Sequence, residues 1–311
     1  MSNEFWAAAA RDWVYYQAPL RPSEKVVASY RQVLDLLPSP KQNQTNYVRV
    51  LGVTPELISL FAEWPENSGI TPWSVTCVDS SPEMIEWVGI PAKKPKQPLR
   101  FRNTKWDNTL NNVDLVLADD VLIQTPTRYL KSFFIEIEGS VDLFFFERPE
   151  ETTSDLSWGG LLAIRSLQST KATVQDVVSR IGSQINSVHS LKWELAAALQ
   201  LRLGTENLGV SASYVYDACH QMRSAGTCSG GFKTGWYAPD WGTLDSYKNS
   251  AEKLYFHTET EIITAAVAAG LTLVNTYTGD YDDGRDNILV FQKDKEKYYQ
   301  NTQTIAIHEH Y

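Results

Sequence analysis

Short apolar runs alternate with helical patterns along the first half of the chain. The runs 47–53, 74–78, 99–102 and 113–118 are rich in β-branched and aliphatic residues, which is typical of strands. Apolar residues recur at helical spacing after the first run, and helices are also predicted after Asp79 and over 129–137. A fifth strand is predicted at 141–146. Strands that are apolar on both faces and alternate with helices indicate a parallel sheet covered on both sides.

The same alternation returns near the end of the printed sequence. Residues 259–269 have a helical pattern, and the runs 271–276 and 287–292 follow as strands. Because only a short polar link joins these two strands, we expect them to pair antiparallel. The sequence therefore predicts an α/β fold with a doubly wound, mostly parallel seven-stranded sheet whose last strand is antiparallel.

A mainly helical insertion is predicted between residues 151 and 255. Apolar positions recur at helical spacing from Val174 to Leu203, which indicates one long helix or two in series, and 211–222 indicates another. The stretch 224–246 is rich in glycine and aromatic residues, and loops of this length often act as lids or binding loops. We therefore divide the chain into an N-terminal helical cap (1–45), a core (46–150), an insertion that forms a substrate lid (151–255) and a C-terminal part of the core with a tail (256–311).

Composition and charge narrow the class of protein. Of the 311 residues, 43% are hydrophobic and 21% charged, as in soluble globular proteins, and the net charge of −9 argues against a nucleic-acid partner. No apolar run reaches the about 18 residues that cross a bilayer, and residues 1–13 lack the features of a signal peptide. We expect a cytoplasmic protein without a membrane partner. The three cysteines form no CxxC pair, so neither a disulfide framework nor a metal site is predicted.

Two strand-to-helix turns carry the first candidate binding residues. In GVTPEL, Gly52 ends the strand, Thr54 stands at an N-cap position and Pro55 at the first helical position. In VDSSPEM, Asp79 ends the second strand 27 residues after Gly52. Ligands bind at the carboxyl ends of strands in open α/β sheets. The alternative interpretation is that both turns are ordinary capped turns.

These motifs resemble the class I S-adenosylmethionine-dependent methyltransferases. The order GVTPEL, VDSSPEM and DLVLADD, with APLRPSE at 18–24 and LYFHTETE at 254–261, looks closest to a small-molecule group with PLRP and GVTPEL segments. The resemblance covers about residues 45–150 and 256–293 and implies a Rossmann-like core. It also implies methyl transfer from S-adenosylmethionine, with S-adenosylhomocysteine as product, to an oxygen, nitrogen or carbon of a small organic molecule of the kind found in specialised metabolism.

The resemblance also implies which residues contact the cofactor. A sulfonium cofactor has no pyrophosphate, so the single Gly52 can replace the glycine-rich turn of dinucleotide folds. Asp79 would accept the ribose hydroxyls, and Arg21 in PLRP would pair with the cofactor carboxylate or an acidic substrate. The adenine contact falls on Trp106 or Asp107, although Lys105 stands where the family pattern has its acid. The full cofactor set is Gly52, Thr54, Asp79, Ser80, Met84, Trp106, Asp107, Asp119 and Arg21.

Candidate bases and substrate contacts are spread over the chain. His257 lies in LYFHT, which the family places near the pocket, whereas His189 and His220 lie in the insertion. A lone histidine can equally serve local hydrogen bonds, so both interpretations stay open. Candidate substrate-binding residues are Tyr16, Trp236, Tyr281 and Arg285.

Two other functions stay open. The fold can serve as a non-catalytic binding module, and an aminopropyl-type transferase is compatible with the adjacent acids Asp119 and Asp120. A nicotinamide dehydrogenase would need a fuller glycine pattern, and the P-loop, HExxH and GxSxG signatures are absent. The sequence specifies neither the acceptor atom nor the oligomeric state.

Overall fold

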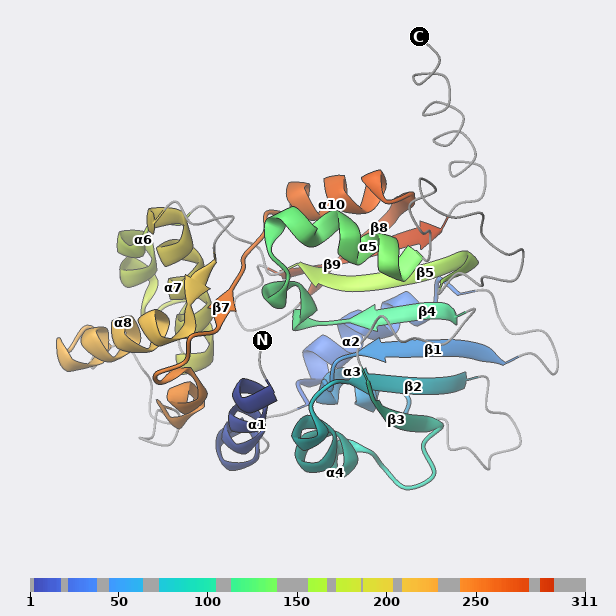
Figure 1. Ribbon diagram of the computed structural model, residues 1–311, viewed down its shortest axis with the longest axis horizontal. Helices are drawn as coiled ribbons and strands as arrows, with labels where there is room; N and C mark the ends of the chain where they lie inside the picture. The colour runs from blue at the N-terminus through green and yellow to red at the C-terminus, as the bar shows by residue number, and fades with distance from the viewer. Residues whose placement is uncertain are drawn as a thin grey trace, which may run out of the picture.

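A seven-stranded sheet forms the centre of the described part of the chain (Figure 1). The computed structural model describes residues 3–17, 22–37, 45–63, 73–104, 113–138, 156–166, 172–185, 187–203, 209–228, 241–279 and 286–293. Within them the strand order is β3-β2-β1-β4-β5-β9-β8. The strands are β1 (Asn46–Leu51), β2 (Trp73–Asp79), β3 (Leu99–Asn103), β4 (Val113–Ala118), β5 (Leu156–Ser166), β8 (Leu271–Gly279) and β9 (Asp286–Lys293).

The strand directions confirm the predicted fold class. β1 pairs in parallel with both β2 and β4, and β2–β3 and β4–β5 are parallel as well. β9 lies between β5 and β8 and pairs antiparallel with both. The chain order reverses direction around β1 and β4, so the carboxyl ends of these two central strands adjoin at the point where ligands bind in open α/β sheets.

The strand that pairs with β4 on the side away from β1 was not predicted from the sequence. We expected a fifth strand at 141–146, a stretch that lies outside the described residues. The observed neighbour is β5 (Leu156–Ser166), which pairs with β4 through partners such as Leu117 and Ala163. These residues belong to the sheet and not to the helical insertion, in which the sequence analysis places them. Both stretches are apolar, and apolar character alone does not choose between them.

Helices cover both faces of the sheet (Figure 1). On one face lie α2 (Glu24–Leu34), α3 (Pro55–Ser59) and the π-helical turn η3 (Met84–Gly89), and on the other lie α5 (Leu130–Glu138) and α10 (Glu259–Ala268). The side chains of β4 alternate between the two layers: Leu115 and Leu117 pack against the first group, and Val116 and Ala118 against the second. All four are at most 1% exposed, which accounts for the uninterrupted apolar run in the sequence.

The insertion has an apolar core of its own. It lies beyond the carboxyl ends of the central strands, beside α1 (Asn3–Asp12) (Figure 1). The long helical pattern is two helices, α6 (Val174–Arg180) and α7 (Val188–Leu203), and Gly182 between them has a φ of +85°. α8 (Ala212–Ser224), η6 (Gly242–Tyr247) and a two-stranded sheet of β6 (Val210–Ser211) and β7 (Lys253–Leu254) follow. The shorter elements elsewhere are η1 (Trp13–Gln17), α4 (Ile90–Ala92), η4 (Asp120–Gln124) and η5 (Thr127–Tyr129).

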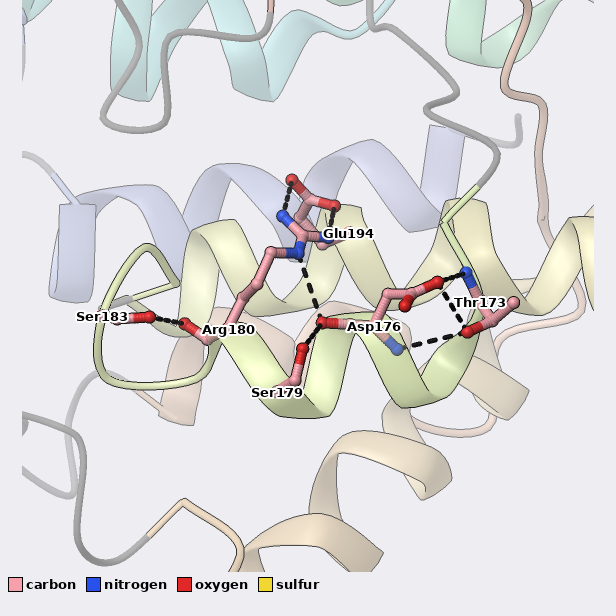
Figure 2. A network of polar contacts seen from close by, with 6 residues as sticks. All are labelled: Thr173, Asp176, Ser179, Arg180, Ser183 and Glu194. Atoms are coloured by element: carbon pink, nitrogen blue, oxygen red, sulfur yellow. Dashed lines mark hydrogen bonds and ion pairs between the residues drawn. The ribbon is translucent and has the colours of Figure 1, made fainter.

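Polar contacts fix α6 against α7, as Figure 2 shows. Thr173 and Asp176 form a capping box at the start of α6, in which the Thr173 N–H donates to Asp176 Oδ2 at 2.8 Å. At the other end of α6, Arg180 donates to both carboxylate oxygens of Glu194 on α7, at 2.9 and 3.3 Å. This two-pronged pair sets the position of α7, which carries the side chains that face the candidate site.

No helix in the described ranges combines the length and the apolar character needed to cross a bilayer.

Candidate active site

The first strand-to-helix turn depends on Gly52. Its φ is +76°, a conformation that residues with a side chain rarely adopt, and its N–H donates to the carbonyl of Val78 at 2.8 Å. Thr54 stands at the N-cap position of α3, but its side chain makes no capping hydrogen bond. Both residues line a cavity at the carboxyl edge of the sheet. The turn therefore presents backbone and a hydroxyl to that cavity.

Asp79 joins this turn to the next one. Its Oδ2 accepts a hydrogen bond from the Val53 N–H at 2.9 Å, and its Oδ1 accepts one from the Ser81 N–H at 2.8 Å. Burial raises the pKa of the Asp79 carboxyl, and the two backbone donors partly oppose that shift. Each carboxylate oxygen can accept a second hydrogen bond. Asp79, Ser80 and Met84 all line the cavity, so the carboxylate can serve the turn and a ligand together.

Asp119 lines the same cavity from the end of β4. It is 2% exposed, and its Oδ1 lies 2.8 Å from Arg165 Nε, which is equally buried. The Tyr30 hydroxyl lies 3.3 Å from the same oxygen and donates to the Ala118 carbonyl at 2.7 Å. Arg165 compensates the charge of Asp119, so this carboxylate offers hydrogen-bond acceptors in a fixed position without an unbalanced negative charge.

Aromatic side chains from outside the sheet form a second group in the lining of the cavity, called the aromatic wall. The Phe5 ring meets the rings of Trp6 and Tyr247 edge-on, with centroids 5.3 and 5.6 Å away. α1 and η1 place Phe5, Trp6 and Trp13 on this wall, while α7 and η6 supply Trp193 and Tyr247. These elements belong to the N-terminal segment and the insertion, so the cavity lies between the sheet and its additions.

Two charged side chains lie within the aromatic wall. Lys192 on α7 is 4% exposed, and its Nζ lies 4.7 Å from the ring centroid of Trp193 and 5.0 Å from that of Tyr247. Asp12, at the end of α1, is 8% exposed and accepts a hydrogen bond from the Ser246 N–H at 2.7 Å. Burial raises the pKa of the Asp12 carboxyl, and the hydrogen bonds from Ser246 oppose the shift, with a smaller opposing effect from the nearby Lys192. Both residues line the cavity.

The cavity has a volume of about 160 Å³ and two chemically distinct halves. The sheet half is made by the turns after β1, β2 and β4, and the second half is the aromatic wall with Asp12 and Lys192. No group of three or more His, Cys, Asp or Glu side chains that could hold a metal ion occurs in the ranges that the structure describes.

His257, a candidate base, does not line this cavity. Its Nε2 lies 2.8 Å from the Thr125 carbonyl and 3.3 Å from the Leu122 carbonyl, and its Nδ1 lies 3.4 Å from Thr127 Oγ1. The ring is 2% exposed, and burial lowers its pKa. The contacts show a histidine that secures the segment after β4, and its placement does not support a role as base.

The rest of LYFHTETE makes similar bridging contacts. The Tyr255 N–H donates to the Ile123 carbonyl at 2.9 Å, and Gln200 on α7 forms reciprocal hydrogen bonds with the Phe256 backbone at 2.8 and 3.0 Å. Thr258 and Glu261 then form the capping box of α10. The motif therefore joins the insertion to the core, next to the cavity-lining residue Ile123.

The other two histidines are not brought to the cavity by any described contact. His220 on α8 packs against Tyr216 and Trp241, with ring centroids 4.3 and 5.5 Å apart, and does not line the cavity. Burial lowers its pKa. His189 lies at the start of α7, and its side chain is outside the described residues.

Several predicted contacts also fall outside the described residues. These are the cofactor candidates Arg21, Trp106 and Asp107, the substrate candidates Trp236, Tyr281 and Arg285, and the side chains of Tyr16 and Asp120. The PLRPSE and GVTPEL motifs nevertheless meet within the described part: the Ser23 N–H donates to the fully buried Glu56 at 2.8 Å.

Sequence reasoning missed Asp12, Lys192, Ser246 and Tyr247 as cavity residues. One signal was available for Lys192, which interrupts the apolar helix LKWELAAALQ beside a tryptophan. A lysine with apolar neighbours on every side of its helix has little solvent to reach, and this favours burial. No local signal connects Asp12 with Ser246, because 234 residues separate them.

Comparisons with known proteins find solved structures that are similar to this chain at low sequence identity. No protein-family model matches the sequence, and no curated protein matches it significantly. The magnesium protoporphyrin IX methyltransferase of Synechocystis PCC 6803, solved with S-adenosylhomocysteine, is 12% identical, with 86% of this chain and 81% of that chain covered and a TM-score of 0.42.

Two further solved structures are similar to the same degree. A 1,6-didemethyltoxoflavin-N1-methyltransferase of Burkholderia thailandensis is 12% identical, with 95% of this chain and 91% of that chain covered and a TM-score of 0.44. A Rhodobacter sphaeroides protein provisionally assigned as a Zn-dependent alcohol dehydrogenase is 11% identical, with 92% and 98% covered and a TM-score of 0.48.

Proposed function

We propose that the protein transfers a methyl group from S-adenosylmethionine to a small organic acceptor. The observation that carries this proposal is a single cavity with two unlike halves. Gly52 and Asp79 line the half at the carboxyl edge of the sheet, and aromatic residues of α1, η1, α7 and η6 line the other. Methyl transfer needs two partners held side by side, and two adjoining half-sites meet that need.

The sheet half fits an adenosyl group with a methionine chain. Asp79 retains capacity for two more hydrogen bonds, which matches the two hydroxyls of a ribose. Met84 offers an apolar, polarisable surface for a purine. Gly52 and Thr54 would lie along the methionine chain, where the positive φ of Gly52 permits a close approach of backbone to ligand.

The aromatic half fits the acceptor. Flat rings in an enclosed wall favour a small organic molecule over a polymer, and we propose that the insertion and α1 together form the lid over it. The bound cofactor would supply an activated methyl group with a good leaving group. The chain itself would hold the acceptor in line, exclude water and fix its polar atoms.

The alternative functions gain less support from these contacts. An aminopropyl-type transferase was suggested by the acids at 119 and 120, but Asp119 is paired with Arg165 and so offers less net charge to a polyamine. A non-catalytic binding module would bind S-adenosylmethionine without converting it to S-adenosylhomocysteine. A turnover assay with a panel of aromatic acceptors distinguishes this alternative from an enzyme.

Calorimetric titration with S-adenosylhomocysteine tests the proposal directly. We expect saturable binding and a rise in melting temperature, because a ligand that binds the folded state alone stabilises it. Absence of binding at millimolar ligand would contradict the proposed function.

Asp79→Asn tests the placement of the ribose. An alanine here would leave both the Val53 and Ser81 N–H groups without their acceptor, whereas asparagine keeps one side-chain oxygen for one of them. We expect about tenfold to hundredfold weaker S-adenosylhomocysteine binding, since charge-assisted hydrogen bonds contribute about 1.5–3 kcal/mol. Asp176→Asn is the matched control, because Asp176 also accepts backbone hydrogen bonds but lies in the α6 capping box. Equal affinity of both variants would place the ribose elsewhere.

A further inference from the structure

The aromatic half of the cavity contains one buried cation in a defined position. Lys192 is 4% exposed, lines the cavity and lies over the rings of Trp193 and Tyr247. Most lysines reach solvent with their ammonium group, and a buried one carries a desolvation cost. Ring faces offset part of that cost by cation–π attraction, which also holds the ammonium group in place beside the cavity.

The charges around Lys192 come from three neighbouring elements. Asp12 of α1 lies within electrostatic range, and Asp245 of η6 acts on Asp12 in turn. On α8, Cys219 lies near Lys192, and burial raises the pKa of this thiol to about 12, so it stays neutral. Burial also raises the pKa of the Tyr247 hydroxyl, which stays neutral as well. The wall thus combines one ammonium and one carboxylate, and the ammonium lies against flat rings.

We infer that the acceptor is a planar aromatic compound bearing an acidic hydroxyl, bound as its oxyanion against Lys192 between the rings of the aromatic wall. This inference rests on the proposed methyltransferase function and deepens it. The rings supply stacking and edge contacts for a flat molecule, and the ammonium group supplies the charge that favours the ionised oxygen. A cationic amine held against the Trp193 and Tyr247 rings would meet repulsion from the same group, and only a position beside Asp12 would favour it.

The oxyanion also accounts for the placement of the histidines. Neither His257 nor His220 lines the cavity. An acceptor that loses its hydroxyl proton to water as it binds needs no base at the moment of transfer. Its oxygen then forms a bond to the methyl carbon while the carbon–sulfur bond breaks, and the electron pair of that bond stays on sulfur. Lys192 acts by lowering the pKa of the bound hydroxyl.

The test uses 4-nitrophenol, a flat phenol whose ionised form is coloured, with the 311-residue chain saturated with S-adenosylhomocysteine. The absorbance of the bound probe is followed against pH. We expect the pKa of bound 4-nitrophenol to fall by about one unit below that of the free probe, which is a tenfold preference for the oxyanion. Lys192→Arg should keep this shift, and Lys192→Met should abolish it.

Lys248→Met is the matched control, since Lys248 is an exposed lysine directly after η6. It should bind and ionise the probe like the wild type. Circular dichroism and the affinity for S-adenosylhomocysteine show whether each variant is folded. If Lys192→Met does not fold, Lys192→Gln replaces it, and the wild-type titration by itself can still contradict the inference.

Three outcomes would overturn the inference. These are an unshifted probe pKa in the wild type, the same shift in Lys192→Met as in the wild type, and no probe binding at millimolar concentration while S-adenosylhomocysteine still binds. If the protein bound 4-nitrobenzoate through Lys192 and did not bind 4-nitrophenol, the acceptor would be an aromatic carboxylate. That result would also reject an acceptor with an acidic hydroxyl. Failure of S-adenosylhomocysteine itself to bind would reject the proposed function. The probe is therefore also titrated without S-adenosylhomocysteine, so that this failure can be distinguished from failure of the inference about the acceptor.

Discussion

At the scale of the residue, Gly52 is part of the cavity lining and has a backbone conformation that a side chain would strain. Its φ of +76° is costly for a residue with a side chain, although a Cβ there would meet Val121 only at 3.8 Å. Substitution therefore introduces backbone strain without a steric clash. The strain would shift the turn that carries Val53 and Thr54, and with it the edge of the cavity.

Gly52→Ala should destabilise the fold by about 1–2 kcal/mol, the usual cost of a left-handed conformation for a residue with a side chain, and should weaken S-adenosylhomocysteine binding. Urea unfolding measures the first effect and calorimetry the second. Gly159→Ala is the control, because Gly159 on β5 has a φ of +80° and a Cβ added there would meet no other atom within 4 Å. The control should lose similar stability and keep its affinity; if Gly52→Ala also keeps its affinity, the turn does not contact the cofactor.

At the scale of elements, the segment that follows β4 is held by a motif more than a hundred residues later in the chain. His257 contacts the carbonyls of Leu122 and Thr125, and Tyr255 donates to Ile123. Val121 and Ile123 of this segment line the cavity. We expect LYFHTETE to act on the site by positioning η4, without touching the ligand.

His257→Gln should lower stability by about 1–3 kcal/mol, because it removes hydrogen bonds from buried carbonyls. The pH dependence identifies the cause. Burial lowers the pKa of folded His257 below its ordinary 6.5, so the unfolded chain binds the proton more tightly. The stability that neutral His257 contributes is therefore present above pH 6.5 and is lost as the pH falls toward the lowered pKa.

Chemical denaturation of wild type and His257→Gln between neutral and mildly acidic pH tests this sign. The stability difference between the two proteins should shrink as the pH falls. A difference that is constant with pH would show that His257 does not titrate differently in the folded and unfolded states.

At the scale of the whole molecule, the cavity joins parts of the chain that fold around different cores. Phe5 packs in the core of the insertion, and the Asp12 carboxylate accepts a hydrogen bond from the Ser246 N–H. The strands at the sheet edge belong instead to the two cores that cover the faces of the sheet. A ligand that touches both halves should therefore couple them.

Hydrogen exchange with and without S-adenosylhomocysteine tests that coupling. We expect slower exchange in the turns 52–55 and 79–84 and also in α1, because α1 lines the cavity together with those turns. α5 and α10 pack on a face of the sheet and should change least. Protection of the turns without any change in α1 would show that the N-terminal helix does not close over the cofactor. Asp79→Asn at the same ligand concentration should show weaker protection throughout.

The sequence alone determined six of the seven strands of the described sheet and the residues at the carboxyl ends of its central strands. Apolar periodicity reports burial on one or both faces of each element, and turn residues such as Gly52 report backbone conformation, so both are local properties. This is why β1 to β4, β8, β9 and the positions of Asp79 and Asp119 at strand ends could be predicted. The strand β5 was not predicted, because the sequence analysis placed 156–166 in the insertion, and its pairing with β4 is a contact between segments distant along the chain.

Only the tertiary structure decided what lies opposite that edge. Asp12, Lys192 and Ser246 come from distant parts of the chain, and their burial depends on the packing of α1 against the insertion. In the sequence, a lone lysine or aspartate is expected to be solvent-exposed, because burying a charge is costly. The partners that offset this cost lie far away along the chain, so the sequence does not reveal them. His257 shows the same limit: its motif suggested a site, and its contacts show that it holds the site's wall in place.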